Sequence, residues 1–452
     1  MERKSGVLLP VFSLPGRFGI GTLGSGARRF VDRLAEGGFR LWQTLPLLPP
    51  DGYGSPYAAL SSFAMDPALI DPDELVACEL LRPREADSCA LPSEGGLHPS
   101  ARKARTVLSE AAERAGRTAV ENFLQGNPET AAYCKALADR GASFTEISFL
   151  QYEAHREWAS LRAYAAARGI GIIGDLPIYP AQGSLDVCLF PDAFCLNAQG
   201  EPADVAGVPP DYFAPEGQVW GNPLYDWARA AESGYAYHRA RLSYLCRCFD
   251  GVRLDHFRGY ESYFAIPHGA PAKEGRWEAG PRDDLFRALA PILSGHTVIA
   301  EDLGEVGEAV EALRARVGAL SSRVLPFGFL GDPQSPHLPH NCPADSVVYS
   351  GTHDTPPLAA YLANMPEGER RYLLDYCGAE EGEGLLPILC TLLACHAAYA
   401  ILPLCDLFGL GEEARINTPG KADGNWRWRC TEAQLDALDT ETLFYYNRLY
   451  GR

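Results

Sequence analysis

The chain has 452 residues, of which 58 are acidic and 40 basic, so that its formal net charge is −18. This excess of acid argues against nucleic acid or an anionic membrane as a partner, because both bind basic surfaces. An uncharged substrate remains open. No run of about 18 apolar residues without charge occurs, so no membrane-spanning helix is expected.

The cysteines and the start of the chain indicate a cellular compartment. The 13 cysteines form no disulfide framework, so reduced thiols in a cytoplasmic protein are expected. The first apolar run is short and is broken by Pro10, which does not favour a signal peptide. Cysteine and histidine nowhere take zinc-like spacing, and neither a metal nor a cofactor is expected.

The first part of the chain begins with a strand–helix–strand pattern. Strands are predicted at residues 6–10 and 39–45, with a helix at 27–37 between them. The glycine-rich stretch 19–26 lacks a following Gly-Lys-Ser/Thr, which favours a connecting loop over a phosphate-binding loop. A long loop after the second strand holds Tyr53 and Tyr57, which either pack the loop or bind a ligand.

Two insertions are expected around the third strand. Residues 71–145 are rich in Ala, Glu and Arg and predict a helical insertion, followed by a helix at 144–168. A strand at 169–177 contains Asp175 near its end. Residues 178–230 are crowded with Pro, Gly, Asp and aromatic residues, so we expect an irregular insertion that carries a substrate-covering loop.

The rest of the chain continues the alternation. Five more strands are predicted at 249–254, 297–300, 323–328, 346–354 and 399–404, and helices at 233–248, 283–293, 308–316, within 368–396 and within 432–449. Eight strands with helices between most of them predict a single (β/α)8 (TIM) barrel over 1–452, with insertions after strands 2 and 3. A doubly wound sheet is the alternative, but no dinucleotide-binding fingerprint follows the first strand.

Acidic residues end four of the predicted strands. Asp175, Asp255, Glu301 and Asp354 each follow an apolar run. One such acid is often a helix cap or an ion-pair partner. The carboxyl ends of barrel strands all face one mouth, however, and we therefore expect the four acids to converge.

Arg253 helps to choose between two chemistries for such a cluster. It lies two residues before Asp255, so both side chains point to the same face of the strand. A divalent ion held by the carboxylates with His256 or His353 is one possibility, and glycoside cleavage by two carboxylates is the other. A fixed cation would compete with a metal ion but would keep Asp255 ionised, whereas Glu301 would need a raised pKa to donate a proton.

Eight motifs then resemble one family, the 4-α-glucanotransferases of the amylomaltase type (glycoside hydrolase family 77). They are SLPGRFGIGTLG, GYGSPYAALSSFA, GDLPIY, GVPPDYFAPEGQVWGNPLYDW, GVRLDHFRGY, IAEDLG, SGTHD and RINTPG with NWRWR. They occur in the family's order from near residue 13 to near 430. The resemblance therefore covers almost the whole chain.

The resemblance implies a retaining transfer of α-1,4-glucan segments between maltooligosaccharides or to glucose, through a covalent glucosyl-enzyme. It implies Asp255 as the nucleophile, Glu301 as the acid/base and Asp354 as the carboxylate that stabilises the transition state. The residues that match substrate-binding positions are Arg253, His256, His353, Tyr57, Asp175, Asp211, Trp220 and Asn425, with Trp426 beside the last. We expect residues 207–227 to hold water away from the acceptor.

The chain also departs from the family's pattern. An Asp that usually precedes SPY is absent, and the Asn that usually follows GTHD is Thr355. The first strand has Leu9-Pro10-Val11 where the family usually has a His. A non-catalytic glucan-binding protein on the same fold is the alternative that these departures support, and a metal-dependent barrel enzyme is a third.

Overall fold

The computed structural model describes residues 2–91, 107–210, 215–304 and 306–452. Eight parallel strands close into a barrel in the order β1-β12-β11-β10-β9-β6-β3-β2. They are β1 (Lys4–Leu8), β2 (Leu41–Gln43), β3 (Gly171–Leu176), β6 (Gly251–Leu254), β9 (Thr297–Ala300), β10 (Leu320–Val324), β11 (Ser346–Tyr349) and β12 (Tyr399–Pro403). The predicted (β/α)8 barrel is confirmed, because β1 pairs with both β2 and β12 and so leaves no open sheet edge.

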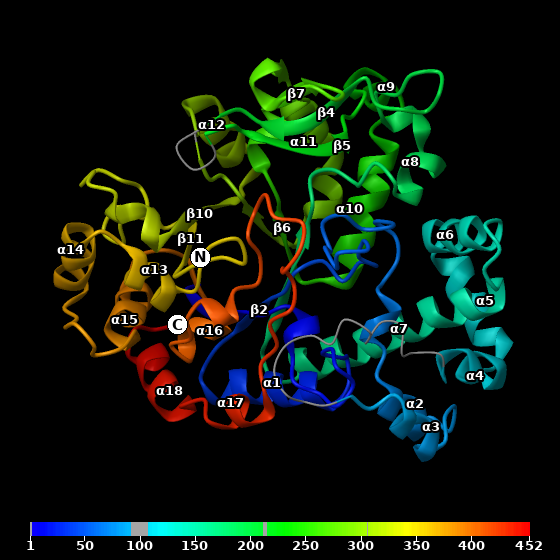
Figure 1. Ribbon diagram of the computed structural model, residues 1–452, viewed down its shortest axis with the longest axis horizontal. Helices are drawn as coiled ribbons and strands as arrows, with labels where there is room; N and C mark the ends of the chain where they lie inside the picture. Colours follow the sequence, from blue (N-terminus) through cyan, green and yellow to red (C-terminus); the bar gives the residue numbers. More distant parts are fainter. Residues whose placement is uncertain (1, 92–106, 211–214, 305) are drawn as a thin grey trace.

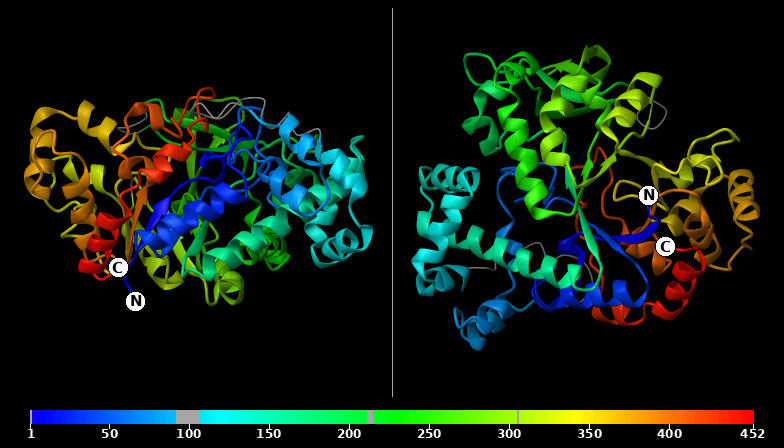
Figure 2. Two further views of the ribbon diagram at one scale, coloured as in Figure 1. Left: turned by 90° about the horizontal axis from the view of Figure 1, so that it is seen from below. Right: turned by 180° about the vertical axis from the view of Figure 1, so that it is seen from behind.

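Helices surround this barrel (Figure 1). The longer ones are α1 (Ser25–Glu36), α7 (Phe144–Ala166), α10 (Ala236–Cys248), α11 (Arg282–Leu293), α12 (Glu308–Val317), α14 (Glu367–Cys377), α15 (Leu386–Ala394) and α18 (Thr440–Leu449); shorter ones are α9 (Trp227–Glu232), α13 (Leu358–Asn364), α16 (Leu404–Leu407) and α17 (Glu432–Asp436). The two ends of the chain lie side by side in every view (Figure 2). Arg452 Nη1 donates to the Lys4 carbonyl at 3.0 Å, which fastens the end of the chain to β1.

The sixth barrel strand differs from the prediction. Residues 323–328 were expected to be a strand, but β10 ends at Val324 and a 3-10 helix (Leu325–Phe329) follows. Pro326 has no N–H for the strand ladder, and its fixed φ suits the first turn of a helix. The Val324 N–H leaves the ladder as well and donates to His337 Nδ1 at 3.1 Å.

The predicted helical insertion is present in its described part. It contains α2 (Pro72–Ala77), α3 (Pro83–Ser88), α4 (Val107–Arg114), α5 (Arg117–Gly126) and α6 (Pro128–Ala138). Helices α4, α5 and α6 stand at the side of the barrel against α7, in cyan in Figure 1. Tyr133 and Cys134 of α6 pack with Ala64 and Leu185 in a small core of their own.

The prediction that 178–230 is irregular is wrong in part. It contains α8 (Leu185–Leu189), β4 (Asp204–Val208) and β5 (Gln218–Pro223), and β4 and β5 join β7 (Ser262–Pro267) and β8 (Arg276–Ala279) in an antiparallel sheet. The order is β5-β4-β7-β8, so β4 pairs with a strand about 60 residues later. A glycine within β4 weakens the strand pattern in the sequence. The structure requires it, because a Cβ on Gly207 would lie 2.2 Å from the Gln218 carbonyl oxygen.

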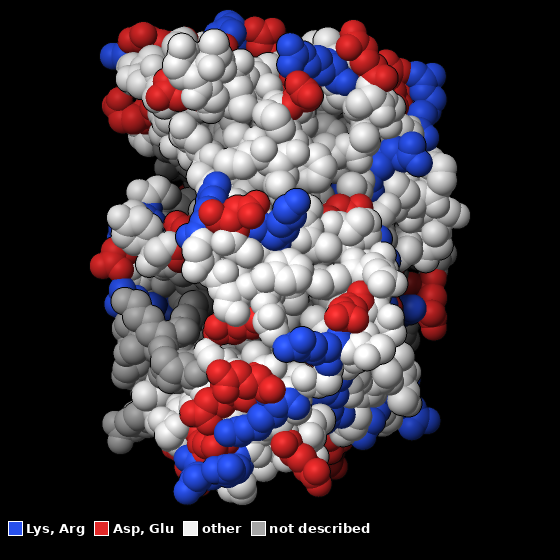
Figure 3. All heavy atoms as spheres, turned by 90° about the vertical axis from the view of Figure 1, so that its right-hand side faces the viewer, with Lys and Arg blue, Asp and Glu red and all other residues white. Residues whose placement is uncertain are grey.

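The surface charge is mixed. Figure 3 looks onto the side that carries α4–α6, and acidic and basic side chains alternate over it. The net charge of −18 is therefore not gathered into one acidic patch on this face. In the described part of the chain, no helix has the length and apolar character that a membrane crossing requires.

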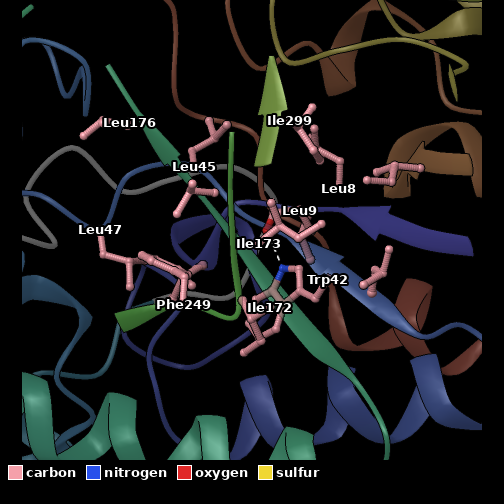
Figure 4. Packing of buried hydrophobic residues seen from close by; sticks show 14 of the residues in the cluster. Leu8, Leu9, Trp42, Leu45, Leu47, Ile172, Ile173, Leu176, Phe249 and Ile299 are labelled. Carbon is pink, nitrogen blue, oxygen red and sulfur yellow. Dashed lines mark hydrogen bonds between the residues drawn. The ribbon is translucent and has the colours of Figure 1, made fainter. Parts of the chain in front are cut away.

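Trp42 of β2 lies in the apolar layer between the barrel and helices α1 and α7 (Figure 4). It is fully buried, touches Phe30 and Trp158 edge-on, and donates from Nε1 to the Leu9 carbonyl at 2.8 Å. Strands in a parallel barrel are buried on both faces, and all of β2 and every residue of β1 after Lys4 are buried here. The core therefore combines apolar packing with one hydrogen bond that the indole supplies.

We predict that Trp42→Phe lowers the free energy of unfolding by about 2–4 kcal/mol, since it leaves a void and an unpaired carbonyl at Leu9. Urea unfolding followed by circular dichroism measures the change. Tyr445→Phe on exposed α18 is the control and should change it by less than about 0.5 kcal/mol. Equal effects of the two substitutions would contradict the role of Trp42.

Candidate active site

Four barrel strands deliver acids to one end of the barrel. Asp175 lies within β3, Asp255 directly follows β6, Glu301 directly follows β9, and Asp354 lies five residues past β11. Strands β3, β6 and β9 are neighbours in the barrel. The four acids therefore lie at the same end of the barrel, as expected for the ends of parallel strands.

Arg253 is the centre of these contacts. Its Nη1 donates to both carboxylate oxygens of Asp175, at 2.8 and 2.6 Å, and to Asp255 Oδ1 at 3.0 Å. Asp175 and Arg253 are also paired in the register of β3 with β6. Arg253 and Asp175 are buried, so the cation and the anions satisfy one another away from water.

Tyr57 adds a third partner to Asp175. Its hydroxyl donates to Asp175 Oδ2 at 2.6 Å, and its ring stacks on His353 with centroids 5.2 Å apart. Trp426 completes the group, with its ring centroid 5.9 Å from that of Tyr57. Asp175 is thus occupied by Arg253 and Tyr57 and orients both of them.

Glu301 is held by the backbone of the neighbouring strand end. The His256 N–H donates to Glu301 Oε2 at 2.8 Å, and the Phe257 N–H donates to the Glu301 carbonyl at 2.9 Å. His256 has φ of 45°, a left-handed conformation that is uncommon outside glycine. Its ring meets Trp220 of β5 edge-on at 4.9 Å, which brings the antiparallel sheet next to the acids.

Asp354 has two side-chain partners. His353 Nε2 lies 3.1 Å from its Oδ2, and Asn417 Nδ2 donates to its Oδ1 at 2.6 Å. The Asn417 N–H also donates to the His353 carbonyl at 3.0 Å. Asn417 belongs to the RINTPG motif, but the sequence offered no signal that singled it out within that motif.

The two remaining expected binding residues are Asn425 and Asp211. Both ends of the Asn425 amide are used within its own loop: Oδ1 accepts from the Thr418 N–H at 2.9 Å and Nδ2 donates to the Lys421 carbonyl at 2.7 Å. Asn425 therefore shapes the loop that presents Trp426. Asp211 lies outside the described residues.

The three carboxyls carry different pKa values. Burial raises the pKa of Glu301 to about 8, and the charge of Asp255 adds to this against the opposing pull of Arg253. Burial also raises the pKa of Asp255, to about 6, although Arg253 acts to lower it. At Asp354 burial is outweighed by the charge of His353 and by hydrogen bonds from His353 and Asn417, which bring its pKa to about 2.

These values refine the expectations drawn from the sequence. The raised pKa of Glu301 agrees with the environment that a proton donor needs. Arg253 acts to lower the pKa of Asp255, as the sequence suggested, but burial is the larger influence on that carboxyl. Burial lowers the pKa of His256 to about 4, so its ring is neutral near pH 7.

The arrangement bears on metal binding as well. Within the described ranges, no group of three or more His, Cys, Asp or Glu side chains has the geometry to hold a metal ion. Arg253 already bridges Asp175 and Asp255, which are the carboxylates that a metal ion would need. The donor set therefore favours chemistry by the carboxylates themselves.

A barrel with acids at the ends of neighbouring strands and aromatic rings beside them suits the cleavage of glycosidic bonds by two carboxyls. The family model described as 4-alpha-glucanotransferase, glycoside hydrolase family 77, matches residues 9–136 and 105–435. The chain belongs to this family, and it is an enzyme of that class. The resemblance drawn from the sequence motifs is confirmed.

Individual relatives agree over their full length. The 4-alpha-glucanotransferase of Aquifex aeolicus is 38% identical over 95% of this chain and 96% of its own, and that of Thermus thermophilus is 37% identical over 96% of each. The solved amylomaltase from Streptococcus agalactiae, in complex with acarbose, is 29% identical and covers all of both chains with a TM-score of 0.95.

The pKa of Glu301 makes a prediction about stability. A carboxyl whose pKa is raised on folding stabilises the protein below its unfolded value, near 4.5, and this contribution is lost as pH rises through about 8. Glu301→Gln can still accept from the His256 N–H and cannot ionise. We expect it to be more stable than the wild type at pH 9 by about 1–3 kcal/mol, after allowance for partial exposure.

Urea unfolding at pH 5 and pH 9 measures this difference. Glu311→Gln, at a side chain that is 55% exposed, is the control and should show no such pH dependence. A Glu301→Gln variant whose advantage does not grow with pH would mean that the Glu301 pKa is not raised.

Proposed function

We propose that this chain is a retaining 4-α-glucanotransferase that moves α-1,4-glucan segments from a maltooligosaccharide donor to glucose or a second oligosaccharide. The observation that carries the proposal is the pair Asp255 and Glu301, which directly follow the adjacent strands β6 and β9 and differ in pKa. Pairs of carboxyls with separated pKa values mark the two roles that glycoside chemistry requires. A covalent intermediate is a general property of the family.

In the first half-reaction Asp255 is the nucleophile. A carboxylate oxygen of Asp255 forms a bond to the anomeric carbon of the donor as the bond from that carbon to the glycosidic oxygen breaks. Glu301 gives its proton to the departing oxygen, which leaves as the free 4-hydroxyl of the released sugar. The raised pKa of Glu301 keeps that proton available near neutral pH.

The second half-reaction reverses these roles. Glu301, now ionised, takes the proton from the 4-hydroxyl of an incoming sugar, and that oxygen displaces Asp255 from the anomeric carbon. The original configuration at that carbon is thereby restored. A separation of about 5–5.5 Å between the two carboxyls, which nucleophilic attack requires, remains a prediction.

Asp354 and its neighbours would bind the reacting sugar. With a pKa of about 2, Asp354 stays ionised and can stabilise positive charge at the anomeric centre while it accepts from sugar hydroxyls. His353 and His256 lie beside the acids and can donate to or accept from hydroxyls as well. Arg253 and Asp175 would act mainly through one another, by fixing Asp255 and Tyr57.

Aromatic rings would line the glucan path. Tyr57 and Trp426 form one group beside His353, and Trp220 forms another beside His256. Trp220 lies on the β4–β5 hairpin, and this supports the role of 207–227 in holding water away from the acceptor. Asp211 in the same segment completes the proposed substrate-binding set, and Asn425 contributes by shaping the loop that presents Trp426.

The thiols bear on where the enzyme works. All 13 cysteines are free, and eight of them are buried. Disulfides are rare where the glutathione and thioredoxin systems keep thiols reduced. We therefore place the enzyme in a reducing compartment, the cytoplasm.

Maltotriose tests the activity directly. The wild type should give glucose and a ladder of longer oligosaccharides, resolved by chromatography, whereas glucose and maltose without longer products would indicate a hydrolase. Asp255→Asn and Glu301→Gln should each lower kcat by roughly 10³-fold or more, because the nucleophile or the proton donor is lost.

Glu278→Gln on β8 is the control and should retain activity, since its carboxyl contacts Arg276 and none of the acids. Asp255→Asn should also still bind acarbose, which shows that the site is intact. A fully active Asp255→Asn enzyme would exclude the nucleophile, and an inactive wild type that binds glucan would favour the non-catalytic alternative.

The pH profile gives an independent test. The free enzyme needs ionised Asp255 and protonated Glu301, so kcat/KM should rise with pH through about 6 and fall through about 8. Initial rates of maltotriose transfer between pH 4.5 and 9.5 measure the profile. A profile that keeps rising above pH 9 would be incompatible with Glu301 as the proton donor.

A further inference from the structure

A surface hollow lies next to the loop that supports Asp354. It is an open surface hollow of about 600 Å³, bounded by the segment 410–434 between α16 and α17. The same segment supplies Asn417 and Trp426 to the candidate active site. One stretch of chain therefore connects the active site to this hollow.

The hollow has more cationic side chains than its acidic residues neutralise. Arg415 pairs with Glu412 at 3.0 Å, and Arg427 pairs with Asp423 at 2.5 Å. Lys421 and Arg429 also line the hollow, and among the described residues neither has a carboxylate within ion-pair distance. With Glu413, which also lines the hollow, its four cations face three carboxylates, and this net positive charge stands out in a chain whose net charge is −18.

Arg429 is the more informative of the two. It is only 3% exposed, and its one hydrogen bond is from Nη1 to the Gly16 carbonyl at 3.2 Å. A guanidinium has five N–H donors, and burying its charge without an anion is costly. The carboxylate of Glu432 acts on Arg429 from beyond ion-pair distance and is itself paired with Arg29. A buried arginine that lines an open hollow without an ion pair of its own indicates an anion that comes from solution.

We propose that this hollow binds a phosphate-type oxyanion, with Arg429 and Lys421 as its cationic ligands. Arginine suits such an ion because its planar fork matches two oxygens, and lysine adds a mobile point charge at the rim. A volume of about 600 Å³ exceeds a bare phosphate and admits a sugar attached to it. Inorganic phosphate and a sugar phosphomonoester share this chemistry.

Arg415 links the hollow to the acids. It lines the hollow, and its Nε donates to the Asn417 carbonyl at 3.0 Å. Asn417 in turn donates to Asp354. An anion beside Arg429 would hold this segment in place, and occupancy would thereby favour the arrangement in which Asp354 is held by Asn417.

Calorimetric titration of the full chain with inorganic phosphate tests the site. Ionic strength is held constant with chloride, which screens non-specific attraction equally in every sample. We expect saturable binding that is weakened about tenfold by Lys421→Gln and lost in Arg429→Gln. Arg371→Gln, at an 82% exposed arginine on α14, is the matched control and should bind as the wild type does.

Titration with glucose 6-phosphate separates the two sources of the anion. Tighter binding than phosphate indicates a phosphomonoester, and equal binding indicates the free ion.

The proposal is overturned if phosphate gives no saturable heat, or if Lys421→Gln and Arg429→Gln bind as the wild type does. Arg429 would then serve only to hold the Gly16 carbonyl. If Arg429→Gln fails to fold, Lys421→Gln, which changes an exposed side chain, still decides. The readout is binding, so it is independent of glucan transfer.

Discussion

The buried guanidinium of Arg253 is the interaction on which the site depends. It is enclosed by the barrel and neutralised by Asp175 on one side and Asp255 on the other. Asp175 is the fully buried partner and accepts from Arg253 with both oxygens, so loss of its carboxylate would leave a buried cation short of partners, which is among the costliest defects that a core can carry. Asp175 in turn accepts from Tyr57, and Tyr57 stacks on His353. A charge requirement in the strands thereby fixes the aromatic rings above them.

Three carboxyls in one site have three different pKa values because their partners differ. Glu301 faces burial and the charge of Asp255 and receives only one N–H, so it retains its proton. Asp354 receives two side-chain hydrogen bonds and the charge of His353, so it remains ionised. Asp255 lies between these cases, because Arg253 opposes burial. Each pKa follows from contacts that a different loop or strand supplies, and this lets one barrel end hold carboxyls of different acidity together.

The insertions add side chains next to the acids without altering the barrel. In the sheet β5-β4-β7-β8, two strands precede β6 in the chain and two follow it. The sheet thereby brings Trp220 of β5 next to His256, the residue after Asp255. The segment 410–434 plays a similar part from the other direction, because it reaches Asp354 through Asn417 and also bounds the cationic hollow. Loops of this kind can change substrate preference while the eight strands keep the acids in place.

The sequence by itself determined the barrel, the strand ends that carry the acids, and the family. Fully buried parallel strands read as apolar runs, and an acid at the end of such a run is visible without a structure. Tertiary structure alone decided what the acids contact. The pairing of β4 with β7, the bond from Asn417 to Asp354, and the use of the Asn425 amide within its loop join residues whose local sequence patterns show no sign of the contact. The pKa of Asp255 belongs to the same group, since burial is a property of the folded chain and outweighs the neighbouring arginine that the sequence shows.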